Sequence, residues 1–243
     1  MKLGSYYFAS PKSVVAIVPA AGQGTRMGGV ARKQYLPLGG VPLLVLSLKV
    51  LQQVESIREI ILSVPERDRD YCWREIVNPF GLRKVTQIVA GGQRRQDSVC
   101  NGLFAISDPP DMVLVHDGVR PFIDTGLVER VISCAEQTGA AVMAMPIHDT
   151  VKRVDPQGVI QETLNREELW HIQTPQVFRY DWLRKAHQQA QQENWNVTDD
   201  AALIERMRYP VSVVEGSCFN IKITRPDDLI FGEAILNRVG HNP

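Results

Sequence analysis

Residues 14–27 read Val14-Val15-Ala16-Ile17-Val18-Pro19-Ala20-Ala21-Gly22-Gln23-Gly24-Thr25-Arg26-Met27. The first five are apolar and mostly β-branched, which is typical of a strand buried on both faces of a sheet. The run then breaks into small residues and glycines. In an open α/β sheet, the first turn from strand to helix lies at the strand's carboxyl end, where nucleotides bind. This stretch therefore predicts an α/β fold with a nucleotide-binding loop.

The same pattern continues along the chain. Short β-branched runs predict strands at residues 14–18, 57–64, 85–89, 112–115, 140–145 and 211–214. Segments of helical period predict helices at residues 41–54, 67–77, 95–106, 125–138, 180–193, 198–207 and 226–238. Strands that alternate with helices need crossover connections, so we expect a mostly parallel, twisted sheet with helices on both faces.

This alternation lapses between residues 146 and 175. Two short runs, residues 150–154 and 159–163, flank Asp155-Pro156-Gln157-Gly158 and predict a β-hairpin around a Pro/Gly turn. The hairpin has too few apolar residues for a core, and an isolated two-stranded hairpin is marginal in water. A second subunit is a natural surface for it to pack on, so we expect a homodimer.

Composition limits the class of protein. The 243 residues are 44% hydrophobic, enough for one domain over residues 1–243 that includes the hairpin. Acidic and basic residues number 27 each, so the chain has no overall attraction to nucleic acid or to an anionic membrane. The sequence has no run of 18 apolar residues, so it predicts no membrane span. The four cysteines are widely spaced, which argues against structural zinc and disulfides and favours the cytoplasm.

The glycine-rich loop carries positive charge. A dinucleotide fingerprint would need glycine at Met27, and a P-loop would need Gly-Lys-Ser/Thr, which the sequence lacks. Arg26, Arg32 and Lys33 are present instead, and an Arg and a Lys near such a loop can reach several oxygens of one triphosphate. The alternative for the glycine-rich loop is a plain turn between strand and helix, and the alternative for Lys33 is a solvated surface charge.

With Lys33-Gln34-Tyr35-Leu36 after it, the loop resembles the sugar-nucleotidyltransferase superfamily, specifically the 2-C-methyl-D-erythritol 4-phosphate cytidylyltransferase family, and the resemblance covers residues 14–238. It implies a Rossmann-like nucleotidyltransferase domain with a projecting dimerisation arm at residues 146–175. It implies transfer of CMP from CTP to a small polyol phosphate in non-mevalonate isoprenoid biosynthesis, with Mg²⁺ or another divalent cation. The loop residues expected at the nucleotide are Pro19, Ala20, Ala21, Gly22, Gly24 and Thr25.

A second glycine turn, Gly91-Gly92, also follows a predicted strand and runs into a predicted helix. Its free N–H groups and the Ser98 hydroxyl could hold the edge of a cytosine. The alternative is a helix cap made by Asp97 and Ser98. The resemblance places Gly92 and Ser98 against the base, and we expect Gly91 beside them.

The strand at residues 112–115 ends in His116-Asp117-Gly118-Val119-Arg120. A carboxylate at the tip of a central strand is costly unless it binds something, so we expect Asp117 to be the metal ligand beside the nucleotide, with Gly118 next to it. His116 is expected to be a packed structural histidine rather than a base. Arg120 is a candidate for binding the acceptor substrate.

The expected contacts to the acceptor come from the second half of the chain. By resemblance, Thr150 and Arg166 reach across the dimer to the acceptor phosphate, with Thr174 nearby. Thr198 is a further candidate, although helix capping by residues 198–200 is an alternative. Lys222 stands between Ile221 and Ile223, and alternation turns it away from both; the resemblance places it in the active site.

Nucleotidyl transfer needs no covalent protein nucleophile, because the ionised acceptor phosphate attacks the α-phosphorus in line and expels pyrophosphate. Catalysis is then positioning and charge stabilisation. We expect Arg26 and Lys33 to stabilise the transition state, and Arg166 with Lys222 to orient the incoming phosphate. The alternatives are a ribitol 5-phosphate cytidylyltransferase, and a non-catalytic module that binds CTP without releasing pyrophosphate.

Overall fold

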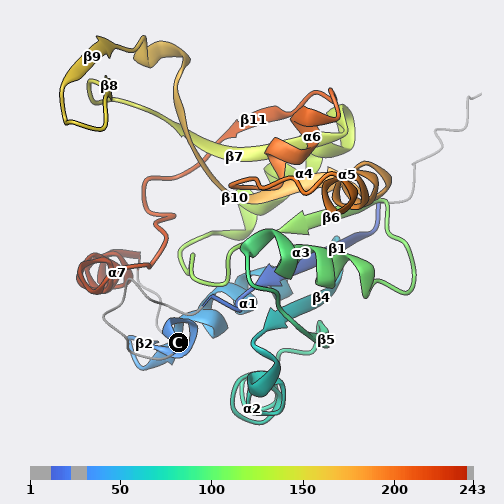
Figure 1. The fold of residues 1–243 in the computed structure, drawn as a ribbon. Helices are drawn as coiled ribbons and strands as arrows, with labels where there is room; N and C mark the ends of the chain where they lie inside the picture. The colour runs from blue at the N-terminus through green and yellow to red at the C-terminus, as the bar shows by residue number, and fades with distance from the viewer. Residues whose placement is uncertain (1–11, 23–31, 240–243) are drawn as a thin grey trace, which may run out of the picture.

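The computed structural model describes residues 12–22 and 32–239. In this part a seven-stranded sheet forms the centre, with strands in the order β11-β7-β10-β6-β1-β4-β5 (Figure 1). β10 is antiparallel to its neighbours β6 and β7, and every other pair is parallel. The strands are β1 (Val14–Pro19), β4 (Ile57–Val64), β5 (Val85–Ala90), β6 (Met112–Val115), β7 (Ala140–Pro146), β10 (Trp170–Arg179) and β11 (Ser212–Glu215). The mostly parallel α/β sheet is therefore confirmed.

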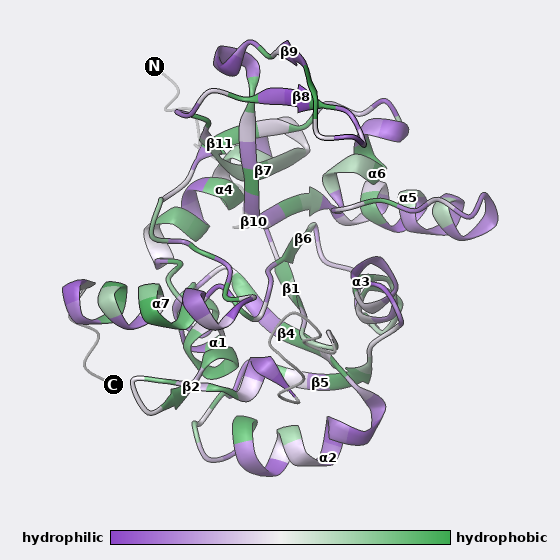
Figure 2. Cartoon of the chain, turned by 60° about the vertical axis from the view of Figure 1, so that its left-hand side comes forward, coloured by the Kyte–Doolittle hydropathy of each residue, from purple (hydrophilic) through white to green (hydrophobic). Residues whose placement is uncertain are grey.

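Helices cover both faces of this sheet. The helices of the described part are α1 (Leu43–Gln53), α2 (Arg69–Tyr71), α3 (Arg95–Phe104), α4 (Thr125–Thr138), α5 (Tyr180–Gln192), α6 (Ala201–Arg206) and α7 (Pro226–Val239). Of these, α7 packs beside β2 (Pro37–Leu38) and not on the central sheet. Along β1, Val14, Ala16 and Val18 pack in one core with α1 and α4, while Val15 and Ile17 pack in another with α3, α5 and α6. Figure 2 shows this pattern as hydrophobic strands between helices with hydrophilic outer faces. All five residues are fully buried, which explains why the run does not alternate.

Several of the predicted helices differ in detail. The helix expected at residues 41–54 begins at Leu43, because β3 (Val41–Pro42) pairs with β2 (Pro37–Leu38) as a small hairpin. The helix expected at residues 67–77 is a succession of three segments: a 3₁₀ helix (Glu66–Asp68), α2, and a π-helical segment (Cys72–Val77). Another 3₁₀ helix, Lys33–Tyr35, follows the residues outside the described part.

No pattern in the sequence predicts β10, which lies in the middle of the sheet. Its first residues, 170–175, fall in the stretch expected to form the arm, but Trp170, His171 and Ile172 pair with the end of β7. The middle of the strand, Gln173 to Gln176, is polar apart from Pro175, and Pro175 cannot donate a ladder hydrogen bond, which argues against a central strand. The sheet accommodates the proline with a register irregularity between Ile172 and Gln176.

The hairpin predicted at residues 150–163 is present and projects from the sheet between β7 and β10 (Figure 1). It consists of β8 (Lys152–Val154) and β9 (Ile160–Thr163), paired antiparallel, and every residue of both strands is exposed. Asp155 closes the turn by accepting hydrogen bonds from the N–H groups of Gln157 and Val159, at 3.0 and 2.9 Å. Gly158 has φ +86°, a conformation that glycine adopts readily.

The order of the strands fixes the place of the site. From β1 the chain winds to β4 and β5 on one side, then returns to β6 on the other side of β1. Ligands of open α/β sheets bind outside the carboxyl ends of the strands at such a reversal. β1 ends at Pro19 and β6 at Val115, so the two predicted site segments emerge side by side. None of the described helices has both the length and the apolar character needed for a membrane crossing.

Candidate active site

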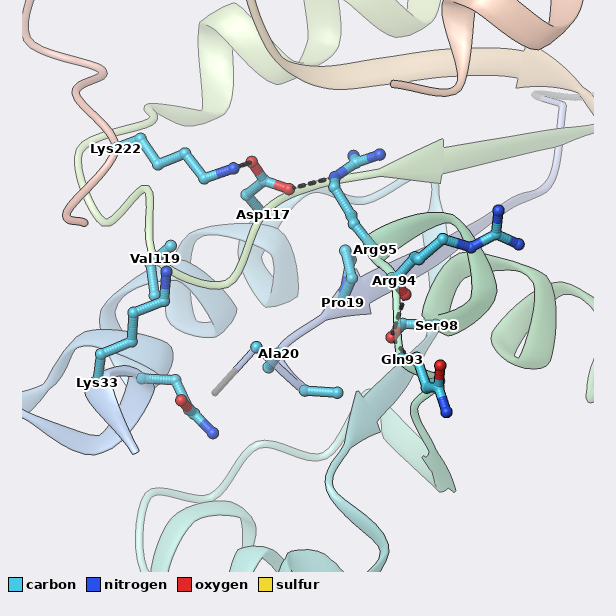
Figure 3. A pocket seen from close by; sticks show the side chains of 14 residues that line it. Pro19, Ala20, Lys33, Gln93, Arg94, Arg95, Ser98, Asp117, Val119 and Lys222 are labelled. Atoms are coloured by element: carbon cyan, nitrogen blue, oxygen red, sulfur yellow. Dashed lines mark hydrogen bonds and ion pairs between the residues drawn. The ribbon is translucent and has the colours of Figure 1, made fainter. Parts of the chain in front are cut away.

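A cavity lies at this reversal, outside the carboxyl ends of β1 and β6 (Figure 3). Lys33 and Lys222 extend into it from one side, and Arg94, Arg95 and Ser98 lie on the other. The residues that line it are Pro19, Ala20, Ala21, Gly22, Lys33, Gln34, Gly92, Gln93, Arg94, Arg95, Ser98, Asp117, Val119 and Lys222. Segments far apart in the sequence therefore meet at the carboxyl edge of the sheet.

Asp117 is the centre of the charges in this cavity. Its Oδ1 lies 2.8 Å from Arg95 Nε, and its Oδ2 lies 2.6 Å from Lys222 Nζ and 3.9 Å from Arg120 Nε. Burial by itself would raise the pKa of this carboxyl, but the attraction of Arg95, Lys222 and Arg120 outweighs burial and holds the pKa well below its usual range. Asp117 is therefore a carboxylate at every physiological pH.

Arg95 extends this network into the core. Its Nη1 lies 2.7 Å from Asp200 Oδ2, and Asp200 Oδ1 lies 3.1 Å from His187 Nε2. Burial opposes the charge of Arg95, but Asp117 and Asp200 more than compensate and raise its pKa. Asp200 is 1% exposed, and its pKa is lowered because Arg95 and His187 outweigh its burial. A rigid chain of ion pairs thus supports one wall of the cavity.

The residues present do not fit a metal ion held by the protein alone. No group of three or more His, Cys, Asp or Glu side chains that could bind one gathers within residues 12–22 and 32–239. Both oxygens of Asp117, the expected ligand, are already ion-paired with cations. A cation bound to this carboxylate would share it with Lys222 and Arg95.

A buried relay holds Asp117 from the other side. The backbone N–H of Asp117 donates to Thr174 Oγ1 at 3.0 Å, and Thr174 Oγ1 lies 3.2 Å from His116 Nδ1. His116 Nε2 lies 3.2 Å from the Arg120 carbonyl oxygen, which can only accept, so the proton belongs on Nε2 and Thr174 donates to Nδ1. Burial lowers the pKa of His116 to about 4. His116 is therefore neutral and structural, as expected from the sequence.

Comparison with known proteins agrees with this geometry. A profile of the 2-C-methyl-D-erythritol 4-phosphate cytidylyltransferase family matches residues 14–238. The chain belongs to this family. A family member from Syntrophus aciditrophicus is 48% identical over 93% of this chain and 96% of its own, and one from Pelotomaculum thermopropionicum is 44% identical over 92% and 94%. The crystal structure of 4-diphosphocytidyl-2C-methyl-D-erythritol synthase from Anaerococcus prevotii superposes with a TM-score of 0.81 at 33% identity, covering 94% of this chain and 97% of that one.

Most of the residues predicted to contact the nucleotide or to act in catalysis line the cavity. They are Pro19, Ala20, Ala21, Gly22, Lys33, Gly92, Ser98, Asp117 and Lys222. Gly24, Thr25 and Arg26 lie outside the described residues. The Lys33 side chain runs close to the loop, since a Cβ added at Gly22 would lie 3.9 Å from Lys33 Cε.

A second hollow adjoins the first and shares Arg95, Asp117 and Lys222 with it. Its volume is about 410 Å³, within the roughly 300–1,000 Å³ of small-molecule sites. Three of the four predicted substrate-binding residues line it: Arg120, Thr174 and Thr198. Thr198 precedes α6, which begins at Ala201 rather than at residue 198, so it does not belong to the helix. The ion-paired centre therefore separates two adjacent compartments.

The two glycine predictions at Gly91 and Gly118 have a packing explanation. Neither residue lines a described cavity. A Cβ at Gly91 would lie 2.2 Å from Ala21 Cβ, and one at Gly118 would lie 2.8 Å from Leu44 Cδ1. The expectation of free N–H groups at the Gly91-Gly92 turn is wrong, because Gly91 N–H donates to the Val64 carbonyl and Gly92 N–H to Ser98 Oγ, at 2.7 and 3.1 Å.

Thr150 and Arg166 lie on the projecting hairpin segment and line neither compartment of their own chain. Arg166 is exposed, and its Nη1 donates to the His148 carbonyl at 2.6 Å. Within one chain, these two predicted residues are therefore separated from the charged centre around Asp117.

Sequence reasoning missed Arg95 and Asp200. A signal for Arg95 was present, because a cation in the first turn of a helix opposes the helix dipole and needs a compensating partner. Asp200 looked like an ordinary helix-start acid, whereas the structure buries it against Arg95 and His187. Asn220 was also missed; its Nδ2 donates to the Thr174 carbonyl at 2.9 Å and joins the Lys222 segment to β10.

Proposed function

We propose that this protein transfers CMP from CTP to 2-C-methyl-D-erythritol 4-phosphate, giving 4-diphosphocytidyl-2-C-methyl-D-erythritol and pyrophosphate. The observation that carries the proposal is the pair of adjacent compartments joined by Arg95, Asp117 and Lys222 at the reversal of the sheet. One compartment suits the nucleotide and the other suits the acceptor. The acceptor phosphate and the α-phosphorus would then meet at the shared wall.

Charge stabilisation is the main contribution of the protein in this proposal. Around the centre, Arg95, Arg120 and Lys222 face the carboxylates of Asp117 and Asp200, so positive charge is in excess by one. Asp117 keeps Lys222 and Arg95 in fixed positions before substrate arrives, which avoids reorganisation during the reaction. Lys33 approaches from the loop side, where the leaving pyrophosphate would lie, and Arg26 is its proposed companion.

A divalent cation, Mg²⁺ in our proposal, accompanies the nucleotide. Triphosphate oxygens are the hard ligands that Mg²⁺ prefers, and Mg²⁺ is commonly bound with few protein ligands. Because Asp117 is ion-paired on both oxygens, we propose that Asp117 orders the cationic side chains, and we assign no step to a metal bound by the protein.

A homodimer is the second part of the proposal. The hairpin exposes Val154, Val159 and Ile160, each about half accessible, which is costly for a surface that stays in water. Packing this hairpin on a second copy would bury them and would bring Thr150 and Arg166 to the partner's acceptor compartment. We further propose one nucleotidyltransferase domain that works in the cytoplasm, where its four free cysteines remain reduced.

The test is release of pyrophosphate from CTP in the presence of the acceptor. We expect turnover with 2-C-methyl-D-erythritol 4-phosphate and little with ribitol 5-phosphate. Lys33→Ala should lower kcat about 100-fold or more, in line with the loss of a preorganised charge contact. Binding of CTP without pyrophosphate release would indicate a non-catalytic module, and preference for ribitol 5-phosphate would reassign the acceptor.

A further inference from the structure

Lys33 is held in place by the residue before it. Arg32 has φ +70° and ψ +57°, the left-handed conformation, which is unfavourable for a residue with a Cβ atom. Its carbonyl accepts a hydrogen bond from Tyr35 N–H at 2.9 Å, so this conformation sets the direction of the 3₁₀ helix Lys33–Tyr35. Such a conformation persists only where the surrounding structure determines it.

Two side-chain contacts hold Arg32, and a third contact holds Tyr35 beside it. Its Nη2 lies 2.9 Å from Asp68 Oδ1, and its guanidinium stacks over the Tyr71 ring at 5.3 Å. The Tyr35 ring packs edge to face on the same Tyr71 ring, with centroids 5.1 Å apart. The segment that carries Lys33 is thus anchored at both ends to the helical segments of residues 66–77.

Asp68 has no local reason to be buried. Its side chain is 0% exposed, and although it stands at the start of α2 it makes no capping hydrogen bond. Among residues 12–22 and 32–239 neither of its oxygens has a hydrogen-bond partner, and its compensation there is ionic, from Arg32 at 2.9 Å and from the more exposed Arg67 at 3.8 Å. A buried carboxylate without hydrogen bonds is costly, so Asp68 depends on its ion pair with Arg32.

We propose that Asp68 is a positioning residue for the transfer reaction: through its ion pair with Arg32 it fixes the segment whose next side chain, Lys33, enters the nucleotide cavity. Asp68 itself lies outside both compartments. The inference rests on the proposed role of Lys33 at the phosphates. It adds a residue from the α2 side of the sheet to the determinants of catalysis.

The test compares Asp68→Asn with Glu66→Gln. Both remove one negative charge from the same 3₁₀ helix, but Glu66 pairs with Arg69 at the surface, with side chains 69% and 46% exposed. We expect Asp68→Asn to lower kcat about 10-fold or more, because a small misplacement of a catalytic group costs up to about 100-fold. KM for CTP should change less than kcat. Glu66→Gln should stay within about 2-fold of wild type.

A double-mutant cycle separates positioning from loss of fold. In the Lys33→Ala background, Asp68→Asn should change kcat by less than about 2-fold, because the group that it positions is gone. An equal loss in both backgrounds, or wild-type kcat for Asp68→Asn, would overturn the inference. Wild-type kcat for Lys33→Ala would instead refute the proposed role of Lys33, and this inference with it.

Discussion

Replacing Arg95 with Met removes the cation that joins two buried carboxylates. Met keeps a similar length of side chain and introduces no new charge. Asp117 retains Lys222 and Arg120, but Asp200, 1% exposed, keeps only His187 among its ion-pair partners in the described structure. Asp200 is therefore the group that suffers most from the change.

Removing one partner of a buried ion pair typically costs about 3–5 kcal/mol, because the other charge stays buried. For a chain of this size, that loss corresponds to a fall in Tm of about 6–20 °C. The effect depends on pH. Because the folded pKa values of Asp117 and Asp200 lie below the unfolded value of about 3.9, their contribution is full above pH 4 and is lost as pH falls below it.

The assay is urea unfolding of wild type and Arg95→Met at pH 7 and at pH 3.5. We expect the difference in unfolding free energy to be large at pH 7 and smaller at pH 3.5, where protonation relieves Asp200. Arg94→Met is the matched control, because Arg94 precedes Arg95 and pairs with Asp97 at the surface. A loss below about 1 kcal/mol at pH 7, or a loss that does not vary with pH, would refute the reasoning.

Three other predictions concern Thr174, His116 and the sharing of the site between two subunits. Thr174→Val leaves the Asp117 N–H and His116 Nδ1 unpaired and should cost about 1–3 kcal/mol for each in urea unfolding, while Thr174→Ser should not. With the folded pKa of His116 near 4 and an unfolded value near 6.5, stability should fall by about 3 kcal/mol as pH drops through that window, and His116→Gln should flatten the slope. Mixing inactive Arg166→Ala and Lys222→Ala chains should restore about a quarter of wild-type activity if the site is shared between subunits, and none if it is not.

The sequence was informative where one chain segment decides the structure alone. Val14 to Val18 is apolar at every position, and this predicted a strand buried on both faces, which the structure confirms. The Pro/Gly turn after Asp155 likewise predicted the hairpin. It failed at β10, where Gln173, Thr174 and Pro175 resemble a loop; their burial arises only because β6 and β7 leave a gap that this strand fills.

For the candidate site, too, local patterns predicted one part and tertiary packing decided the other. The sequence by itself determined that a glycine-rich turn and an acidic strand tip lie at the carboxyl edge of a parallel sheet, because periodicity and turn chemistry are local. Local patterns placed Lys33 and Asp117 there individually, and the family resemblance added Lys222. Only the tertiary structure decided that Asp117 is ion-paired on both oxygens, that Arg95 links it to Asp200, and that Asp68 anchors Arg32. These pairings join residues up to 105 positions apart, and electrostatic partners at such separations are set by packing, which no local pattern encodes.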